Sequence, residues 1–257
     1  MELADQVCVI TGGASGIGAA CCRAFAKHGA HVVVADRDAG GAEQVAGEIG
    51  GLGVACDVGD PAQIDALVQA ARRRFGRIDV FFSNAGIATG GDVLNVPLRV
   101  WQMQWDVNVM AHVHAARAVL PEMLERGSGY LVHTASMAGF LTVPGNAHYS
   151  VAKHAVVGFA EWLAIQYHDR GVRTSLLAPL AVQTPMLPPG TDPKVAGPIR
   201  EPEEVAQQVI EAMREERFLI LTDPIAQTWM ERKTADPERW LGSMRRTLQR
   251  LRSRART

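Results

Sequence analysis

The sequence lacks the features that mark several classes of protein. It has four cysteines in 257 residues, with no C-x-x-C pair and no histidines at zinc-binding spacing, so we expect neither a disulfide framework nor a metal site. It has no run of about 18 apolar residues, which excludes a membrane-spanning helix. It also lacks an excess of either charge, because 26 Lys and Arg oppose 27 Asp and Glu. This balance does not favour binding to nucleic acid or to an anionic membrane.

The amino terminus and the cysteines indicate a location. Residues 1–6 have no basic segment followed by a cleavable apolar one, so we expect no secretory signal and a cytoplasmic protein. Each cysteine lies among apolar residues, and we interpret all four as buried small hydrophobic side chains. For the adjacent Cys21 and Cys22, a reactive redox pair is the alternative.

Short apolar, β-branched runs alternate with longer amphipathic segments. The expected strands are Val7–Ile10, His31–Ala35, Gly53–Cys56, Ile78–Phe82, Gly129–Thr134, Val172–Leu177 and Phe218–Thr222. The expected helices are Ala19–His28, Ala42–Ile49, Ala62–Phe75, Val100–Leu120, Tyr149–His168 and Pro202–Arg214. The strands are continuously apolar, which favours burial on both faces. The pattern predicts an α/β fold: one doubly wound, Rossmann-type domain over residues 1–257, with a parallel sheet of about seven strands.

Two segments fall outside this alternation. Residues 185–202 hold six prolines, which exclude a long helix, and we expect a functional loop beside the substrate. Residues 224–257 are expected to form a helical, basic extension. Its apolar residues recur at three- and four-residue spacing: Trp240, Met244, Leu248 and Leu251. We interpret this part as a docked amphipathic helix with a frayed basic end, and an RNA- or phosphate-binding tail is the alternative.

A glycine-rich loop lies between the first strand and the first helix. It consists of Thr11, Gly12, Gly13, Ala14, Ser15, Gly16, Ile17 and Gly18. Glycines there allow a tight turn and let the backbone approach a pyrophosphate, while the helix N-terminus supplies free N–H groups and a positive dipole end. The G-x-x-x-G-x-G spacing differs from the G-x-G-x-x-G of other dinucleotide folds. Its place between a strand and a helix predicts a dinucleotide-binding loop rather than an ordinary turn.

The end of the second strand distinguishes two cofactors. Asp36 offers a carboxylate that accepts hydrogen bonds from a ribose 2′-hydroxyl and repels a 2′-phosphate. With Ser15 in place of a basic loop residue, NAD is favoured over NADP. Arg37 is a complication, because a guanidinium compensates a 2′-phosphate. A plain strand-end carboxylate is the alternative for Asp36.

A tyrosine and a lysine, Tyr149 and Lys153, lie four residues apart on one face of an expected helix. A free tyrosine has a pKa of about 10 and is a poor base near neutral pH. A nearby lysine charge favours the phenolate and lowers that pKa. Such a tyrosine takes the proton of an alcohol as hydride leaves carbon, and returns it in the reverse reaction. Taken alone, this spacing is common and usually marks a helix surface.

Several motifs together carry a resemblance to a known family. Besides the glycine loop and the Tyr149–Lys153 pair, the chain contains, in order, Asp57-Val58, Asn84-Ala85-Gly86, Asn108, and Ser136 thirteen residues before the tyrosine. From about Val7 to Thr222 the chain resembles the classical short-chain dehydrogenase/reductase family. The resemblance implies a catalytic role for four residues. Tyr149 is the general acid/base, Lys153 also binds the nicotinamide ribose, Ser136 holds the substrate oxygen, and Asn108 holds a water that joins Lys153 to solvent.

The resemblance also implies a set of cofactor-binding residues. Asp57, with Val58 beside it, meets the adenine, and Asn84, Ala85 and Gly86 line the adenosine side. Thr184 matches the position that contacts the nicotinamide carboxamide. The rest of the implied set is Thr11, Gly12, Ser15, Gly16, Ile17, Gly18, Asp36, Arg37, Tyr149, Lys153, Pro179 and Val182. The sequence departs from the family at Leu180, where a glycine is usual. Because leucine disfavours positive φ, we expect a different backbone path and a weaker grip on the carboxamide.

The expected substrate pocket is mostly apolar. It comprises Ser136, Met137, Phe140, Leu141, Val143, His148, Tyr149, Met186 and Leu187. Because it contains no Arg or Lys, a hydrophobic secondary alcohol or ketone fits it better than a sugar phosphate or an acyl-carrier thioester. For His148, a capping or packing role is the alternative to substrate binding.

The expected function is hydride transfer between NAD(H) and such a substrate. Family resemblance suggests a homotetramer or dimer, joined through the helices near 100–120 and 149–168. One alternative is an NADP-dependent carbonyl or acyl-carrier reductase, against which Asp36 argues. Another is a non-catalytic NAD-binding scaffold, against which the intact Asn108, Ser136, Tyr149 and Lys153 argue. A nucleic-acid binder acting through the arginine tail is the third.

Overall fold

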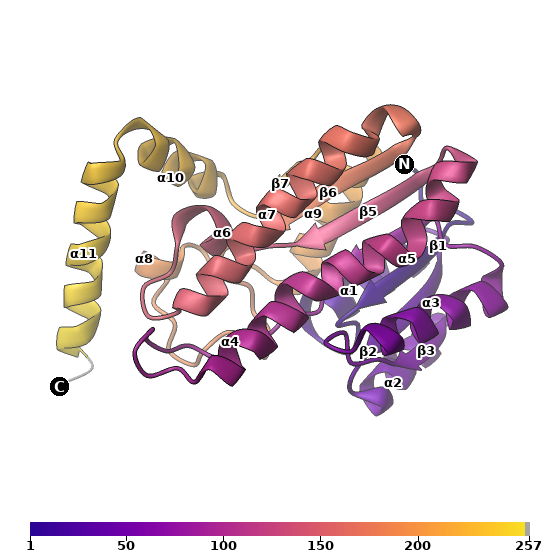
Figure 1. Ribbon diagram of the computed structural model, residues 1–257, viewed down its shortest axis with the longest axis horizontal. Coiled ribbons are helices and arrows are strands. Elements are labelled where there is room, and N and C mark those ends of the chain that lie inside the picture. Colours follow the sequence, from indigo (N-terminus) through magenta and orange to yellow (C-terminus); the bar gives the residue numbers. More distant parts are fainter. Residues whose placement is uncertain (255–257) are drawn as a thin grey trace.

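The computed structural model describes residues 1–254, apart from the side chains at 194, 251 and 254. This part of the chain forms a seven-stranded sheet in the order β3-β2-β1-β4-β5-β6-β7, and every pairing is parallel (Figure 1). The strands are β1 (Val7–Thr11), β2 (His31–Asp36), β3 (Leu52–Ala55), β4 (Val80–Ser83), β5 (Gly129–Thr134), β6 (Val172–Ala178) and β7 (Leu219–Leu221). The strand order reverses between β1 and β4. Ligands of open parallel sheets bind outside the carboxyl ends at such a point.

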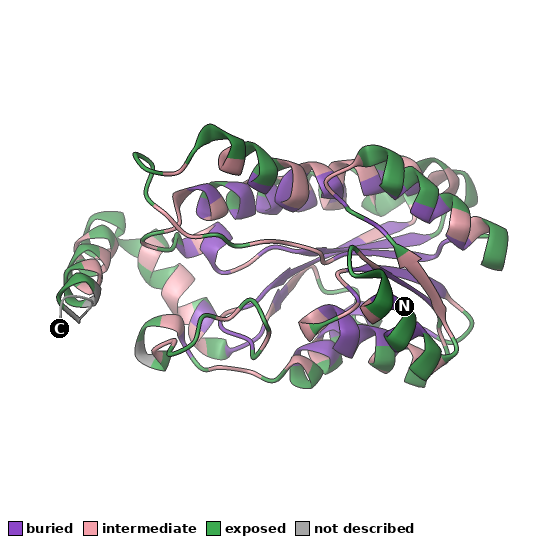
Figure 2. Cartoon of the chain, turned by 90° about the horizontal axis from the view of Figure 1, so that it is seen from below, coloured by how far each residue is buried: buried purple, intermediate pink, exposed green. Residues whose placement is uncertain are grey.

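Helices cover both faces of the sheet, as Figure 2 shows from below. One layer contains α1 (Gly16–Lys27), α2 (Ala39–Ile49) and α9 (Pro202–Arg214). The other contains α3 (Pro61–Phe75), α4 (Leu98–Trp105), α5 (Ala111–Arg126) and α7 (Ala147–Tyr167). The remaining described elements are the short helices and turns η1 (Asp106–Met110), α6 (Ala138–Leu141), η2 (His168–Arg170) and α8 (Pro193–Ala196), and the C-terminal helices α10 (Pro224–Ala235) and α11 (Pro237–Arg254).

The strands divide their side chains between the two helix layers, because successive residues of a strand point to opposite faces. In β1, Cys8 and Ile10 pack with α1, α2 and α9, whereas Val9 packs with α3 and α5. All three side chains are fully buried. The continuously apolar strands therefore serve two cores at once. The prediction of a doubly wound, Rossmann-type parallel sheet is confirmed.

The segment expected as one helix over 100–120 has a different form. It consists of α4, the π-helical turn η1 and α5 in direct succession. Asn108 lies in η1 and pairs twice with the backbone of Ile87, whose N–H donates to Oδ1 and whose carbonyl accepts from Nδ2, both at 2.9 Å. A π turn fits one extra residue into a helix and is frequent at functional sites. Apolar periodicity does not reveal it, because the helical pattern continues on both sides.

The C-terminal helices extend the domain beyond the sheet. Trp229 of α10 packs in a small apolar cluster with Met137. Helix α11 stands apart from both helix layers (Figure 1). Its Trp240 reaches the same cluster, whereas Met244 and Leu248 stay partly exposed. The expected docked helix is thus docked through its first turn. Within residues 1–254, no helix has the length and apolar character needed to cross a bilayer.

All four cysteines are buried and free. Burial raises the pKa of each thiol, to about 12 for Cys22 and about 11 for Cys56. A thiol with such a pKa stays protonated near neutral pH and is unreactive. Their interpretation as small hydrophobic side chains is confirmed, and the redox pair at Cys21 and Cys22 is not supported.

Candidate active site

The glycine loop follows β1, and close contacts require its glycines. Gly12 and Gly16 have φ of 68° and 51°, a region that favours glycine. A Cβ on Gly18 would lie 2.0 Å from the carbonyl oxygen of Gly12, and one on Gly12 would lie 2.9 Å from Cα of Ala85. These positions therefore accommodate hydrogen in place of a side chain, and the loop presents bare backbone to a ligand.

Helix α1 begins inside this loop. Ser15 is its N-cap, and within the described residues the Ser15 side chain makes no capping hydrogen bond. An α-helix leaves its first N–H groups without internal partners, and these groups and the positive dipole end favour a phosphate. The bare loop and the free N–H groups fit the pyrophosphate of a dinucleotide.

Asp36 ends β2 beside the glycine loop. Its Oδ2 accepts a hydrogen bond from the backbone N–H of Ala14 at 3.0 Å, and its Oδ1 accepts one from the N–H of Asp38 at 3.1 Å. These bonds fix the carboxylate next to the loop, whereas Arg37 is exposed. After β3, the exposed Asp57 accepts from the N–H of Gly59 at 2.9 Å, and the neighbouring Val58 is buried.

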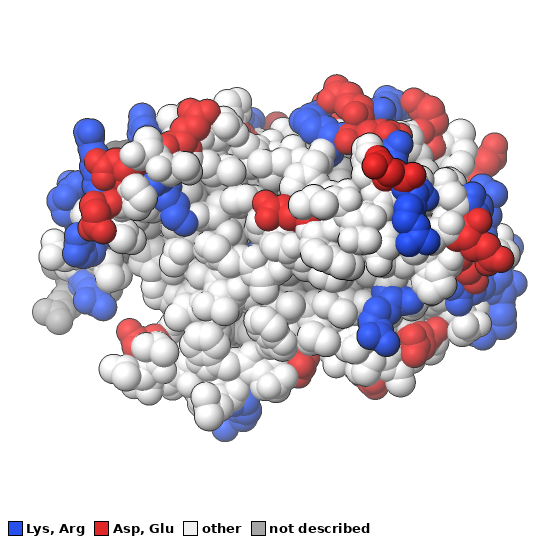
Figure 3. Space-filling view, turned by 45° about the horizontal axis from the view of Figure 1, so that its top comes forward, with Lys and Arg blue, Asp and Glu red and all other residues white. Residues whose placement is uncertain are grey.

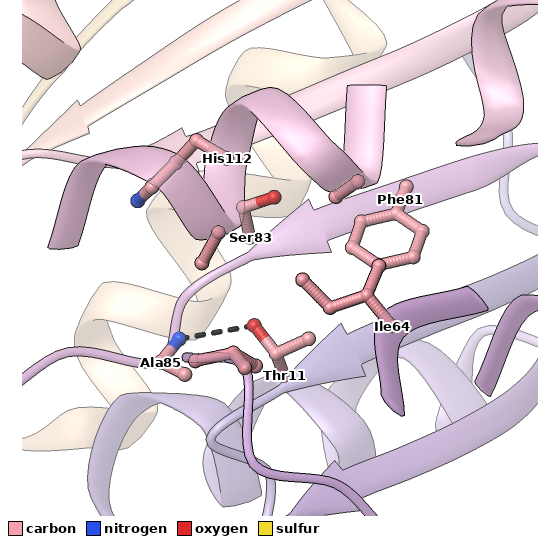
Figure 4. Close-up of a pocket in the computed structure, with 9 residues that line it drawn as sticks. Thr11, Ile64, Phe81, Ser83, Ala85 and His112 are labelled. Atoms are coloured by element: carbon pink, nitrogen blue, oxygen red, sulfur yellow. Dashed lines mark hydrogen bonds between the residues drawn. The ribbon is translucent and has the colours of Figure 1, made fainter. Parts of the chain in front are cut away.

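Thr11 and Asn84 connect three strands at their carboxyl ends. Thr11 Oγ1 accepts from the N–H groups of Asn84 at 3.0 Å and Ala85 at 3.1 Å. Asn84 Nδ2 donates to the Thr11 carbonyl at 3.0 Å, and Thr134 Oγ1 donates to Asn84 Oδ1 at 3.1 Å. The segment Asn84-Ala85-Gly86 is thus held against β1 and β5, at the point where the strand order reverses. Figure 4 shows the bond between Thr11 and Ala85.

A cavity of about 10 Å³ lies behind these residues and is lined in part by Thr11, Ser83 and His112 (Figure 4). It is about the size of one water molecule, so it is separate from any dinucleotide site. Ser83 Oγ and His112 Nε2 are buried and have no hydrogen-bond partner among the described residues. His112 Nδ1 pairs with His133 Nδ1 at 2.9 Å. Burial lowers the pKa of both rings, that of His133 to about 3, so both are neutral near neutral pH.

Ser136, Tyr149 and Lys153 come together between the end of β5 and helix α7. Lys153 Nζ lies 5.7 Å from the centroid of the Tyr149 ring and donates to the Thr134 carbonyl at 2.8 Å. Burial lowers the pKa of Lys153 to about 8. Burial also raises the pKa of Tyr149, and a hydrogen bond with Ser136 opposes that rise. The expected lowering of the phenol pKa is therefore outweighed by burial in this structure.

Asn108 joins this group from the other side. A Cβ on Gly86 would lie 3.0 Å from Asn108 Oδ1 and 3.5 Å from Lys153 Nζ. Both polar atoms thus border the same glycine. The structure brings Asn108, Ser136, Tyr149 and Lys153 together at the carboxyl end of the sheet, where the glycine loop also lies.

Leu180 occupies the place of the usual glycine without backbone strain. Within residues 1–254, the non-glycine residues with positive φ are Asp5, Thr142 and Glu216. The Leu180 N–H donates to Thr222 Oγ1 at 3.2 Å. A Cβ on Gly197 would lie 2.8 Å from Leu180 Cδ1, so the leucine side chain fills space left open by a glycine elsewhere.

The segment after Leu180 returns to the glycine loop. A Cβ on Gly16 would lie 2.8 Å from Thr184 Cγ2, which places Thr184 against the loop. Val182 is buried and pairs with Arg200 as an isolated bridge. The Pro179 carbonyl accepts from the N–H of Met137 at 3.0 Å. Pro179, Val182 and Thr184 therefore form one wall between Met137 and the glycine loop.

The residues expected to bind substrate differ in exposure. Met137 and Leu141 are buried, and Phe140 and Leu187 are partly buried. Val143 and Met186 are exposed, at 44% and 46%. His148 is 2% exposed, its Nε2 lies 2.7 Å from Thr89 Oγ1, and its ring centroid lies 5.5 Å from that of Trp101. This arrangement matches the packing alternative for His148.

Three further polar residues lie at the site without a sequence motif to mark them. Thr89 and Gln104 are hydrogen-bonded beside Asn108 and His148. Lys233 of α10 donates to the Phe140 carbonyl. Lys233 comes far later in the chain than the pocket residues, so its place near them depends on how α10 docks.

A sequence model described as short chain dehydrogenase matches residues 6–194, more than half of the chain. The protein belongs to the short-chain dehydrogenase family. It is accordingly a nucleotide-binding oxidoreductase that acts on CH–OH groups of small molecules. Within this short-chain dehydrogenase, α9, α10 and α11 lie beyond the matched region.

The relatives of this short-chain dehydrogenase include two dehydrogenases that are named for their substrates. It is 39% identical to 1-deoxy-11-beta-hydroxypentalenate dehydrogenase of Streptomyces exfoliatus, over 87% of this chain and 85% of the relative. It is 36% identical to D-threitol dehydrogenase of Mycolicibacterium smegmatis, over 71% of this chain and 72% of the relative. A solved short-chain dehydrogenase/reductase from Burkholderia phymatum, in complex with NAD, superposes with a TM-score of 0.85 and 30% identity, over 93% and 96% of the two chains.

Proposed function

We propose that this short-chain dehydrogenase transfers a hydride between NAD(H) and a hydrophobic secondary alcohol or ketone, with Tyr149 as general acid/base. The observation that carries the proposal is the grouping of Tyr149, Lys153, Ser136 and Asn108 beside a glycine loop shaped for a dinucleotide. A base and an oxygen-binding donor next to such a loop suit oxidation of a C–OH group.

The residues present fit NAD. The glycine loop and the first turn of α1 hold the pyrophosphate, and Asp36, fixed by two backbone N–H groups, accepts from the ribose and repels a 2′-phosphate. The nicotinamide, when bound, supplies the hydride acceptor or donor. At the adenosine end the bordering residues are Arg37, Asp57, Val58, Asn84, Ala85 and Gly86. At the nicotinamide end they are Pro179, Val182 and Thr184.

Proton transfer is the task of the chain's own side chains. In oxidation, Ser136 donates to the substrate oxygen and Tyr149 removes its proton as the C–H bond breaks; in reduction, Tyr149 returns the proton. Lys153, with a pKa of about 8, keeps its charge at neutral pH, and this charge opposes the effect of burial on the phenol. Asn108 borders Lys153 across Gly86, where it would hold the water that joins the amine to solvent.

The apolar pocket wall supports a hydrophobic substrate. Met137 and Leu141 form its buried part, and Val143 and Met186 are exposed at the rim, where an apolar ligand would cover them. The lysine nearest to Phe140, Lys233, is bound to a backbone carbonyl. The two relatives are named for different hydroxyl compounds, so the apolar wall rather than either name carries this part of the proposal.

We further propose that the protein assembles as a homotetramer or dimer through α4, α5 and α7. The face that holds these helices is uncharged over much of its centre (Figure 3). Large apolar side chains are exposed on α4 and α7, among them Trp105 at 40%, Trp162 at 53% and Ile165 at 84%. Exposed apolar side chains that gather on one face mark interaction sites.

The proposed function is tested by oxidising a panel of hydrophobic secondary alcohols and following reduced-nicotinamide absorbance. Wild-type protein is expected to turn over with NAD and far more slowly with NADP. Tyr149→Phe is expected to lose about 10²–10⁴-fold in kcat, with its NAD affinity retained in a calorimetric titration. Turnover that survives in Tyr149→Phe would overturn the acid/base assignment. A preference for NADP would overturn the assignment of Asp36.

A further inference from the structure

A network of hydrogen-bonded polar side chains, Thr89, Gln104, Asn108 and His148, lies behind the proposed catalytic residues. Asn108 Nδ2 donates to Gln104 Oε1, and Gln104 Nε2 donates to Thr89 Oγ1 at 3.2 Å. Thr89 Oγ1 in turn pairs with His148 Nε2 at 2.7 Å. If the Gln104 amide is rotated by 180°, its Oε1 accepts from the Thr89 hydroxyl and N–H at 3.2 Å, and its Nε2 donates to the Ile87 carbonyl at 3.0 Å. In both orientations Gln104 is bonded to Thr89 and lies against the pair that Asn108 forms with Ile87, and the direct bond to Asn108 requires Oε1 to face it.

Packing alone does not explain this network. Gln104 and Asn108 are fully buried, and His148 is 2% exposed, whereas Thr89 lies at the surface. Burying an amide or an imidazole is unfavourable unless it is hydrogen-bonded. An apolar residue on the same face of α4 would fill the Gln104 site without that requirement. Gln104 thus stands where a polar group is needed by its neighbours.

One end of the network is Asn108, the residue that borders Lys153. Asn108 Oδ1 and Lys153 Nζ both flank Gly86, at 3.0 and 3.5 Å from the place of its missing Cβ. Asn108 uses its oxygen on the Ile87 N–H and its nitrogen on the Ile87 carbonyl and Gln104. The two Ile87 bonds set the rotation of the Asn108 amide. Gln104 is the side chain that supports this pair from α4, and Thr89 holds Gln104.

The other end of the network is His148, which lies beside Tyr149. His148 directly precedes Tyr149 at the start of α7, and the Trp101 ring of α4 packs against it. Three segments far apart in the sequence, the loop after β4, the α4–η1 junction and the first turn of α7, are thereby joined around Tyr149 and Lys153. No part of the family motif accounts for Thr89 or Gln104.

We propose that Thr89, Gln104 and His148 are positioning residues that hold the Asn108 amide toward Lys153 and so set the working state of the Tyr149–Lys153 pair. The proposal rests on the proposed function for its catalytic consequence. The Asn108 amide oxygen borders the same glycine as the Lys153 ammonium group. An amide oxygen near an ammonium group stabilises its charged form, and that charge favours the phenolate. Breaking the link from Thr89 to Gln104 removes the side-chain support behind the Asn108–Ile87 pair. The amide oxygen is then held less firmly near Lys153, and the tyrosine becomes a weaker base at a given pH.

The titratable groups around this network lie on several elements. From α7 they are Tyr149 and Lys153, and from α5 it is His112, whose pKa is lowered in part by the Lys153 charge. The charged residues on α4 and η1 are Arg99, which is exposed, and Asp106, whose Oδ1 accepts from Gln102 at 2.8 Å. Burial lowers the pKa of His148 below its ordinary value, which favours the neutral ring. A change in the pH profile can therefore be traced to Tyr149 and Lys153.

The test compares Thr89→Val with Thr89→Ser, since valine keeps the size of threonine and serine keeps the hydroxyl. With NAD and an alcohol substrate, Thr89→Val and Gln104→Met are expected to lower kcat about tenfold, while KM for NAD changes less than twofold. The rising limb of kcat/KM against pH is expected to move upward by about half a unit to one unit. Thr89→Ser is expected to stay within twofold of wild type in kcat.

A second readout separates this proposal from the proposed function. The Asn108 side-chain amide signals in a ¹⁵N NMR spectrum are expected to shift in Thr89→Val and to keep their position in Thr89→Ser. Thr234→Val on α10 is the matched control and should change neither signal nor rate. An unmoved Asn108 signal, an unmoved pH limb, or equal loss in Thr89→Ser would each overturn the proposal. If wild type has no turnover with any alcohol, the proposed function fails, and the Asn108 signals alone decide whether Thr89 and Gln104 position that residue.

Discussion

The proposed cofactor side of the site is made of backbone, whereas the proposed substrate side is made of side chains. At Gly12, Gly16 and Gly18, neighbouring atoms leave space for hydrogen alone. At Met137, Leu141 and Met186, by contrast, apolar side chains of different exposure form the wall. A backbone site requires particular residue types at fixed spacing, whereas an apolar wall accepts many sequences of similar volume. The first kind of site can therefore be recognised in a sequence, and the second cannot.

Gly18→Ala is the change expected to have the largest effect on the cofactor side. Its Cβ would lie 2.0 Å from the Gly12 carbonyl oxygen, so the loop must move. We expect NAD affinity to fall by about 1000-fold or more, which is about 4 kcal/mol. Isothermal titration measures the loss.

Gly47→Ala on the exposed surface of α2 is the matched control, because no atom lies within 4 Å of its Cβ position among the described residues. It should leave NAD affinity unchanged and stabilise the helix by about 0.5–1 kcal/mol. Equal NAD affinity in the two variants would break the comparison between the two sides.

Asp36→Ala is expected to have the next largest effect on cofactor binding, because Asp36 is the side chain that we expect to meet the ribose. Removing the carboxylate removes both the ribose acceptor and the repulsion of a 2′-phosphate, so the preference for NAD over NADP should fall by about 100-fold. The ratio of kcat/KM for the two cofactors measures it. Asp36→Asn keeps an acceptor for the Ala14 N–H, and its result separates loop support from charge. A preference unchanged in both variants would show that another group selects the cofactor.

The His112–His133 pair beneath the site gives a pH-dependent term. Both rings have a lowered pKa in the folded state, that of His133 to about 3, because burial opposes their charge. Their contribution to stability is complete above about pH 6.5 and is lost as pH falls, since the unfolded rings take up protons that the folded rings do not. From pH 6.5 to 5.5 we expect a loss of about 1 kcal/mol for each ring.

Urea unfolding at several pH values tests this expectation. In the double variant His112→Leu/His133→Leu, the dependence of the unfolding free energy on pH should be shallower by about 2 kcal/mol over the same interval. An unaltered slope would mean that the rings are protonated in the folded protein.

Leu180→Gly is expected to have the smallest effect, and it tests the side-chain-made side. The backbone at Leu180 does not adopt positive φ, so restoring the family's glycine should leave NAD affinity within about threefold. The lost contacts beside Gly197 and Trp229 should cost about 1–1.5 kcal/mol of stability. Thermal unfolding and NAD titration of one variant measure both. A large gain in NAD affinity would show that Leu180 does distort the nicotinamide grip.

The limits of sequence-based prediction follow the same division. The parallel sheet and the family could be predicted because apolar strands, the glycine loop and Asp36 are each required by backbone geometry or by charge. The π turn at Asn108 could not, because the apolar helical pattern continues on both sides of it. The burial of Tyr149 and Lys153, which shifts both pKa values, is set by tertiary packing. Leu180 was expected to alter the backbone, and the compensating Gly197 lies in a loop with no local signal linking the two.

The account's central claim is that hydride passes between a substrate carbon and NAD while Tyr149 moves the proton. The most direct test uses a secondary alcohol deuterated at the carbinol carbon, with mass spectrometry of the cofactor after a single turnover. The account predicts one deuterium in the reduced cofactor with wild-type protein. With Tyr149→Phe it predicts that the rate of deuterium transfer falls about 10²–10⁴-fold. Ketone formed while the cofactor stays unlabelled, or label transfer at full rate without the Tyr149 hydroxyl, would contradict it.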